Sequence, residues 1–386
     1  MSRVRALALP PADRAVMSAM FILALGGMVA VYSAVGFLAE TKGGGNSERY
    51  LFGHLLRLGA ALGVAGVCSL VDYRRLARFS RVLLVAALGL LVAVQFVGVV
   101  SGGAQRWLPI GPTTFQPSDV ARVALILHVA VLLARKHAYV TDFQRGFVPL
   151  ALWTGATLLL IGLEDLSTAA MLLLTVSAML FVGGVRLRHL SGSAAVLGVL
   201  AALFLLTSPQ RAARVEAYLG VSLFPHTDSE QVFSASDEGY QAQQSRIAIA
   251  MGGLLGVGPG KSVQRDFLPA PFNDFIYAIV AEEYGLVGAL LLLAVFVYLF
   301  LRGMLRVARA APDPLGFFLA TGLTVSVVLY GFANAAVACG LFPVTGLPMP
   351  FVSYGGTSML ATGAMLGILL NISRHAAPAT PAADPA

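Results

Sequence analysis

Residues 268–288 read LPAPFNDFIYAIVAEEYGLVG, a proline-broken polar start followed by a long apolar run. Asp274 lies where the loop becomes a predicted membrane helix, and an ionisable residue at such a position is costly and indicates a functional site. At about 100° per residue, small residues share the helix face of Asp274. They are Ala278, Ala281, Gly285 and Gly288. Such a stripe packs another helix or lines a site, and the carboxylate at its head favours a lined site.

Composition places the chain in a membrane. Of its 386 residues, 58% are hydrophobic and 12% are charged, whereas soluble domains carry about 25% charged residues. We therefore expect the excess of positive charge to set topology and not to bind nucleic acid. Cys68 and Cys339 both lie in apolar runs, so neither a disulfide framework nor a metal cluster is expected. The first apolar run is too long for a signal peptide and should be kept as a membrane helix.

Apolar runs of spanning length predict an all-α polytopic membrane protein with ten transmembrane helices. The runs are roughly 15–38, 51–71, 80–100, 118–135, 146–163, 165–184, 189–207, 273–301, 314–340 and 352–373. Arg and Lys concentrate in alternate connections, which predicts cytoplasmic N- and C-termini. Residues 1–375 then form one membrane domain, and the low-complexity tail 376–386 is expected to be disordered and cytoplasmic.

The longest connection, residues 208–272, follows the seventh predicted helix and is expected to lie outside the cytoplasm. Within it, 239–262 contains too many glycines to span the membrane but is apolar enough to lie at its surface or to re-enter it. The segment GVGPGK at 256–261 lacks the spacing and the preceding strand of a phosphate-binding loop, so nucleotide binding is excluded.

The connection between the third and fourth predicted helices carries charged and aromatic residues. Arg106 and Trp107 lie in a loop rich in Gly and Pro, and Asp119 and Arg122 follow at the start of the next helix. Their i, i+3 spacing places Asp119 and Arg122 on one helix face. Two interpretations stay open: a structural ion pair, or the wall of an outward cavity in which Arg122 binds a phosphate.

Acids and bases from distant parts of the chain are expected to meet on the outer side of the membrane. The charged candidates are Arg106, Asp119, Arg122, Asp165, Arg211, Arg214, Lys261 and Asp274. The further substrate-binding candidates are Trp107, Gln116, Ser118, Thr168, Gln244, Ser245 and Ser353. Carboxylates that accept a proton from a hydroxyl, together with cations that bind pyrophosphate, suit a phosphorylated lipid that bears sugars.

Five stretches together resemble the shape, elongation, division and sporulation family, which includes FtsW and RodA. They are RWLPIGPTTFQPSDVAR, EDLSTA, GYQAQQSRIAIAMGGLLGVGPG, LPAPFNDFIYAIVAEEYGLVG and GLFPVTGLPMPFVSYGGTSM. They follow the family's order and cover the chain from about residue 100 to 373. The closing GILLNISRH is more similar to FtsW than to RodA.

The resemblance implies a ten-helix peptidoglycan glycosyltransferase of the bacterial cytoplasmic membrane, which polymerises lipid II on the outer face for cell division or elongation. It implies that Asp274 is the essential acid and that a class B penicillin-binding transpeptidase is the partner. The family's glutamate and lysine on the fourth helix are here Asp119 and Arg122. Its histidine and threonine before the essential acid are Phe272 and Asn273, and these departures bear on substrate placement.

Three points stay open from the sequence. A divalent cation, Mg or Mn, is an optional aid to the departing pyrophosphate. A flippase of lipid-linked precursors also uses intramembrane charges and broken helices, although the charges here gather on one side and do not form a path across. A scaffold that only activates other division proteins would tolerate any small polar residue at Asp274.

Overall fold

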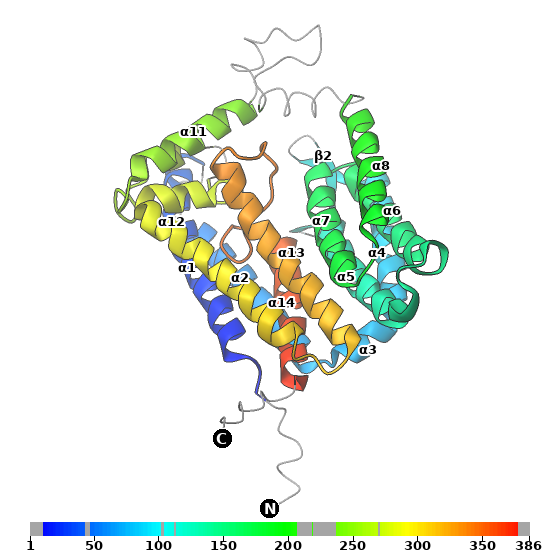
Figure 1. Cartoon of the computed structure of the whole chain (residues 1–386). Helices are drawn as coiled ribbons and strands as arrows, with labels where there is room; N and C mark the ends of the chain where they lie inside the picture. Colours follow the sequence, from blue (N-terminus) through cyan, green and yellow to red (C-terminus); the bar gives the residue numbers. More distant parts are fainter. Residues whose placement is uncertain are drawn as a thin grey trace, which may run out of the picture.

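The computed structural model describes residues 11–42, 47–101, 104–111, 113–206, 218, 237–268 and 271–376. It is a mostly helical bundle in which long apolar helices stand side by side (Figure 1). A helix coincides with each apolar run expected from the sequence. These helices are α1 (Arg14–Lys42), α2 (Ser47–Leu70), α4 (Ser80–Val97), α5 (Pro117–Lys136), α6 (Val148–Gly162), α7 (Leu166–Val182), α8 (Leu187–Leu206), α12 (Ile276–Arg302), α13 (Pro314–Ala338) and α14 (Thr357–His375).

The described part of the chain contains seven helical stretches long and apolar enough to cross a membrane, and α7 is a shorter apolar helix. This is an integral membrane protein, and the count of ten crossings stays a prediction. Arg211, Arg214, the tail beyond residue 376 and most of the connection before residue 237 lie outside the described residues.

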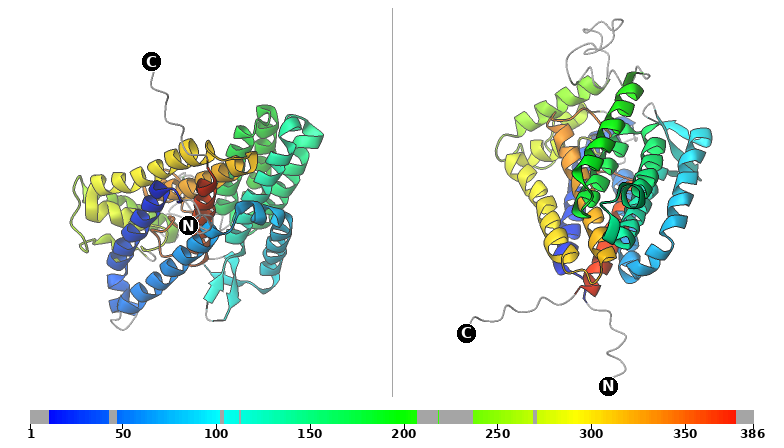
Figure 2. Two further views of the ribbon diagram at one scale, coloured as in Figure 1. Left: turned by 90° about the horizontal axis from the view of Figure 1, so that it is seen from below. Right: turned by 45° about the vertical axis from the view of Figure 1, so that its right-hand side comes forward.

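Helices α5 and α13 form the centre of the bundle, because 78% of the spanning window of each is buried (Figure 2). Helix α14 is also mostly buried, whereas other long helices such as α1, α2, α4 and α12 present large apolar side chains outward, as a lipid-facing surface does. Both central helices carry polar residues toward one end of the bundle, and these residues build the site described below.

Both terminal helices begin or end at the same end of the bundle (Figure 1). There the backbone N–H of Asp13 donates to Ser373 Oγ at 3.0 Å, and Arg302 pairs with Asp13 at 2.8 Å. Four short elements accompany this end: α3 (Tyr73–Arg78), η2 (His137–Tyr139), η3 (Phe143–Phe147) and η5 (Gly303–Ala308). The opposite end carries α11 (Asp237–Gly252), η4 (Gln264–Asp266), the strand that contains Arg106 and the turn that contains Asp274.

A small antiparallel sheet corrects the all-α expectation. Strands β1 (Val99–Ser101), β2 (Ala104–Ile110) and β3 (Thr113–Phe115) follow one another in the order β1-β2-β3. The sequence indicated an irregular loop here because of its Gly and Pro residues. The sheet forms because Trp107 pairs with Val99 and Leu108 with Phe115, and because the backbone N–H of Gln105 donates to Glu164 Oε2 at 2.9 Å.

Helix α12 is broken at Gly285, whose φ of 66° and ψ of −169° are not helical. The backbone groups that the break releases pair with the segment after α11. Glu282 O accepts from the N–H of Val257 at 2.9 Å and Glu283 O from that of Gly258 at 3.0 Å. The N–H of Leu286 donates to Gly253 O at 2.9 Å, and that of Val287 to Leu254 O at 3.2 Å. These four hydrogen bonds give partners to the backbone groups that the helix break leaves unpaired, in a region where an unpaired backbone group is costly.

The break also overturns the predicted site along the face of Asp274. That acid lies in a turn before α12, which begins at Ile276 and not at residue 273. A Cβ atom added at Gly285 would collide with the backbone of Leu254 and Gly256, and one added at Gly252 would collide with that of Ala281. The small residues therefore admit another segment of the same chain. The helix-packing alternative is correct for this stripe.

Candidate active site

Asp274 lies in the turn at residues 271–275, and neighbouring elements fix the backbone of that turn. Asn334 on α13 donates from Nδ2 to Asp274 O and to Leu347 O, both at 2.9 Å. Ser353 Oγ donates to Asn273 O at 2.6 Å and accepts from the N–H of Met349 at 2.8 Å. The loop at 341–356 and α13 thus hold the turn in place, and Asp274 is partly exposed.

Arg106 projects from β2 toward the start of α7. Its Nη1 lies 3.0 Å from Asp165 Oδ2, with 22% and 7% of the two side chains exposed. Asp165 is the N-cap of α7 and accepts from the N–H of Thr168 at 2.9 Å. The neighbouring Glu164 accepts from the N–H of Gln105. The acids of this loop therefore attach the sheet to α7 and orient Arg106.

Gly346 shows how close Arg106 and Asp274 come. A Cβ atom placed on this glycine would lie 3.7 Å from Arg106 Nη2 and 3.8 Å from Asp274 Oδ2. The cation and the carboxylate therefore border the same small space. Gly346 has a φ of +68°, a backbone conformation that favours glycine. A positive group beside an acid at the membrane edge is an arrangement in which a sugar hydroxyl and a phosphate can be bound together.

Asp119 and Arg122 form a second, more deeply buried pair. Arg122 Nη2 lies 3.5 Å from Asp119 Oδ1, and Thr357 Oγ1 donates to Asp119 Oδ2 at 2.7 Å. The guanidinium carbon of Arg122 lies 4.0 Å from the centre of the Tyr330 ring, and only 2% of this arginine side chain is exposed. A guanidinium enclosed in this way favours the structural ion pair over direct binding of a phosphate.

A cavity of about 10 Å³ lies beside the first charged pair, and it is lined in part by Arg106, Ser118 and Asp165. That volume holds about one water molecule. This cavity is therefore too small to hold a sugar or a pyrophosphate.

The remaining candidates fall into four groups. Ser353 takes part by holding the turn of Asp274, whereas Trp107 in β2 and Gln116, the residue before α5, are partly exposed beside the sheet. Gln244 and Ser245 lie on α11, and Ser245 Oγ donates to Ala338 O at 2.8 Å, so this hydroxyl fastens α11 to α13. Lys261 is exposed in a turn next to Gly258.

Sequence reasoning missed four contributing residues. Asn334 is an amide side chain inside an apolar run, and such a polar residue could have been identified from the sequence as a candidate site residue. Gly346 carries no local signal, because its role follows from side chains that approach from elsewhere. Glu282 and Glu283 lie on α12 and are 0% and 1% exposed. Two adjacent acids in a membrane helix also indicate a functional role, and the sequence shows them.

Comparison with known proteins shows the family of the chain. A family model described as cell cycle protein, covering FtsW, RodA and SpoVE, matches residues 14–377. The chain is 36% identical over 360 residues to the stage V sporulation protein E of Bacillus subtilis, with 90% of this chain and 93% of that protein covered. It is 38% identical over 366 residues to a probable peptidoglycan glycosyltransferase FtsW of Alkalilimnicola ehrlichii, with 93% and 88% covered.

Solved structures show the same fold. A chain of a complex described as "Structural coordination of polymerization and crosslinking by a peptidoglycan synthase complex" superposes with a TM-score of 0.75 and 28% identity, over 94% of this chain and 98% of that one. The rod shape determining protein RodA of Thermus thermophilus gives a TM-score of 0.68 at 27% identity, with 94% and 97% covered.

Proposed function

The chain belongs to the FtsW, RodA and SpoVE family of cell cycle proteins, and on this premise we propose that it is a peptidoglycan glycosyltransferase that polymerises lipid II. The observation that carries the proposal is the shared space beside Gly346, which both Arg106 Nη2 and Asp274 Oδ2 border. A relative named peptidoglycan glycosyltransferase covers nearly the whole chain, which supports transfer and not only binding.

Asp274 is the proposed general base. The donor sugar leaves from an α-linked pyrophosphate and the new bond is β-1,4, so the transfer inverts the anomeric centre and requires in-line attack. The Asp274 carboxylate accepts the proton of the acceptor 4-hydroxyl, the oxygen of that hydroxyl attacks the anomeric carbon, and the bond to pyrophosphate breaks. General-base catalysis of this kind contributes about 10²- to 10⁴-fold to a rate.

Arg106 is the proposed partner of the leaving group. Its guanidinium is fixed by Asp165 on one side, so Nη2 is oriented toward the space that the pyrophosphate has to enter. A planar guanidinium binds phosphate oxygens through two parallel hydrogen bonds. The deeply buried Arg122 is paired with Asp119 and is given no direct role in this proposal.

A divalent cation at the site is a further part of the proposal. The described residues contain no group of three His, Cys, Asp or Glu side chains placed to hold a metal. Any Mg or Mn ion at Asp274 would therefore take most of its oxygen ligands from pyrophosphate and water, which suits Mg in particular. Such an ion would add charge stabilisation for the leaving group.

The distribution of charges supports a proposed orientation in the membrane. The end that carries Arg106, Asp165 and Asp274 is proposed to face the periplasm or the outside, and both termini the cytoplasm, with ten crossings in total. The opposite end carries most of the Arg and Lys residues of the described helices, as the positive-inside rule requires. The lipid tails of the substrate would lie against the apolar helices.

The proposed partner is a class B penicillin-binding transpeptidase with one membrane anchor. The structural neighbour with a TM-score of 0.75 comes from a complex described as coordinating polymerisation and crosslinking. By likeness to that chain, this protein is proposed to supply glycan strands to a crosslinking enzyme in cell division or elongation.

A polymerisation assay tests the proposal. Purified protein, alone and with its transpeptidase, is incubated with lipid II, and glycan strands are separated on a gel. We expect strands from the native chain and a loss of about 10²-fold or more for Asp274→Asn. Near-normal polymerisation by that variant refutes the base role. Lipid II movement across vesicles without polymerisation by the native protein favours a flippase instead.

A further inference from the structure

Two adjacent acids, Glu282 and Glu283, lie in the outer half of α12, before the break at Gly285. Both side chains are fully buried, with 0% and 1% exposed. Burying two neighbouring carboxylates is costly unless hydrogen bonds replace the lost water. The proposed reaction does not use either acid, so their retention inside the bundle points to another role.

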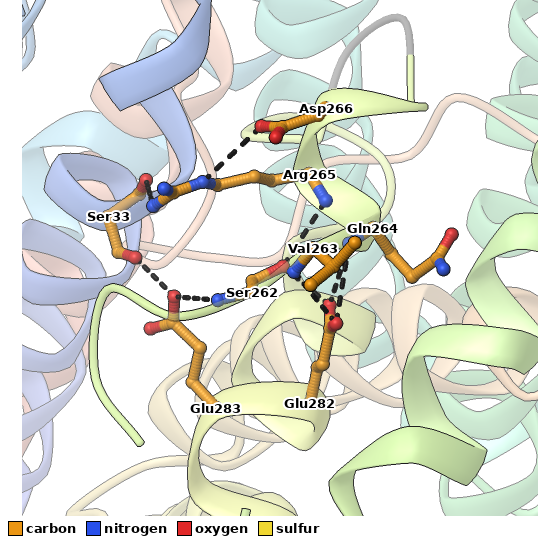
Figure 3. Close-up of polar contacts among 8 residues, drawn as sticks. All are labelled: Ser33, Ser262, Val263, Gln264, Arg265, Asp266, Glu282 and Glu283. Carbon is orange, nitrogen blue, oxygen red and sulfur yellow. Dashed lines mark hydrogen bonds and ion pairs between the residues drawn. The ribbon is translucent and has the colours of Figure 1, made fainter. Parts of the chain in front are cut away.

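Glu282 holds the turn that leads into η4 (Figure 3). Its Oε2 accepts from Ser262 Oγ at 2.5 Å, and its Oε1 accepts from the backbone N–H of Val263 at 2.9 Å. The N–H of Gln264 lies 3.3 Å from both oxygens. One side chain therefore satisfies the donors at the start of a short helix, as a cap does, but from a distant part of the chain.

Glu283 joins the same turn to α1. Its Oε1 accepts from Ser33 Oγ and from the N–H of Ser262, the latter at 3.4 Å (Figure 3). Arg265 donates from Nη1 to Ser33 O at 3.0 Å, which adds a second bond between the turn and α1. Glu283 Oε2 has no hydrogen-bond partner among the described residues.

These bonds close a loop of the chain around the essential acid. Ser262 and Gln264 come before Asp274 in the sequence, and Glu282 and Glu283 come after it. Because the two ends of this stretch are bonded to each other, Asp274 lies in the middle of a closed loop whose base is fixed. The backbone exchange between residues 253–258 and the break in α12 reinforces that base. Closing a loop removes much of its conformational freedom.

We infer that Glu282 and Glu283 are positioning residues for the transfer reaction, which fix the base of the loop that carries Asp274 and connect it to α1. The inference rests on the proposed function for its effect on rate. Misplacing a catalytic group by about 1 Å costs about 10²-fold in rate. Each glutamate acts through the loop and not on the sugar or the pyrophosphate.

The test uses full-length protein with Cys68→Ser and Cys339→Ala, so that a nitroxide can be placed at Phe267→Cys, a half-exposed position just beyond η4. Glu282→Ala and Glu283→Ala are expected to lower kcat for lipid II about 10²-fold, to leave KM within about twofold, and to make the nitroxide more mobile. Glu282→Gln should recover most of the rate, because its amide oxygen still accepts from the N–H groups of Val263 and Gln264. Tyr284→Phe is the matched control on the same turn of α12 and should change neither readout.

Label mobility and kinetics separate the outcomes. A nitroxide as immobile in both alanine variants as in the parent protein overturns the inference, whatever the activity. A raised KM with unchanged kcat also overturns it, because that result indicates direct substrate binding. If the parent protein does not polymerise lipid II, the proposed function fails, while increased label mobility in the alanine variants still demonstrates the closed loop.

Discussion

Arg106 Nη1 lies 3.0 Å from Asp165 Oδ2, and this ion pair fastens β2 to the first turn of α7. The other terminal nitrogen, Nη2, borders the space beside Gly346 that Asp274 Oδ2 also borders. Asp165 thus holds the guanidinium of Arg106 near Asp274, the proposed catalytic acid. The small sheet has a function in this arrangement, because it carries the arginine over the end of the helix bundle.

Replacing Arg106 should impair catalysis more than folding. For Arg106→Ala we expect kcat/KM for lipid II to fall about 10²- to 10³-fold, the usual loss on removal of one group that stabilises a developing charge. Arg106→Lys keeps the charge but loses the planar guanidinium, so its activity should lie between that of the native protein and that of Arg106→Ala. Glycan formation and thermal unfolding are measured in parallel. Equal activity of the lysine and alanine variants would contradict a role for the charge.

Gly346→Ala tests the shared space directly. The added methyl group would lie in ordinary contact with Arg106 and Asp274, without collision, and the left-handed backbone costs about 1–2 kcal/mol. We expect polymerisation to fall about tenfold or more while the protein stays folded.

The matched control is Gly111→Ala. Gly111 also has a positive φ, of +58°, and a Cβ atom there meets nothing within 4 Å. This variant carries a comparable backbone penalty without a methyl group in the site. If both alanine variants lose the same activity, backbone strain accounts for the effect and the space beside Gly346 is not where substrate binds.

The sequence was sufficient to predict the parts of the molecule that depend on local composition. Apolar runs locate the helices because transfer into a membrane depends on about 20 consecutive side chains. That Arg106 and Asp274 would come to the same end of the bundle was also predictable, because both lie in connections that follow or precede apolar runs on the same side.

The features that the sequence did not predict depend on contacts between distant segments. Gly285 can continue a helix or break it, and the break is favoured here because residues 253–258 supply the missing hydrogen-bond partners. In the sequence, Glu282 and Glu283 are two acids whose burial in a helix would be costly. The turn at Ser262, which supplies their hydrogen-bond donors, is evident only in the structure. The sheet was missed because its pairing with α7 goes through Glu164, an acid that looks like a solvated loop residue.

The buried pair of Asp119 and Arg122 gives a prediction that separates its two interpretations. Arg122→Met alone leaves Asp119 buried without a cation, and breaking such a pair costs about 3–5 kcal/mol. Asp119→Asn combined with Arg122→Met removes both charges and should restore most of the stability, since Asn can still accept from Thr357. Thermal unfolding and glycan formation are measured for both variants.

Activity of the double variant decides between the interpretations. If the pair is structural, polymerisation returns in proportion to the folded fraction. A stable double variant that does not polymerise lipid II would assign Arg122 to the substrate, as the alternative interpretation of the sequence holds.

Asp313, at the opposite end of the bundle, gives a prediction about pH. Burial raises the pKa of its carboxyl group, but donation from the Gly316 N–H, Arg74 and Tyr73 outweighs burial, so the pKa lies below its usual value. The three donors lie 2.7, 2.8 and 2.8 Å from the carboxylate oxygens. Because the folded pKa is lower than the unfolded one, the stabilisation is complete above the unfolded pKa and is lost as the pH falls through the folded pKa.

Two variants separate the contribution of the Asp313 charge from that of its helix cap. Asp313→Ala removes the N-cap of α13 as well as the charge, which should cost about 0.5–2 kcal/mol at neutral pH. Asp313→Asn keeps a capping oxygen and loses only the charge, so it should be less destabilised. Since the native carboxylate is protonated in acid, the difference in unfolding temperature between the native protein and Asp313→Asn should shrink as the pH is lowered below about 4. A difference that stays constant from neutral to acid pH would show that the charge of Asp313 does not stabilise this end of the bundle.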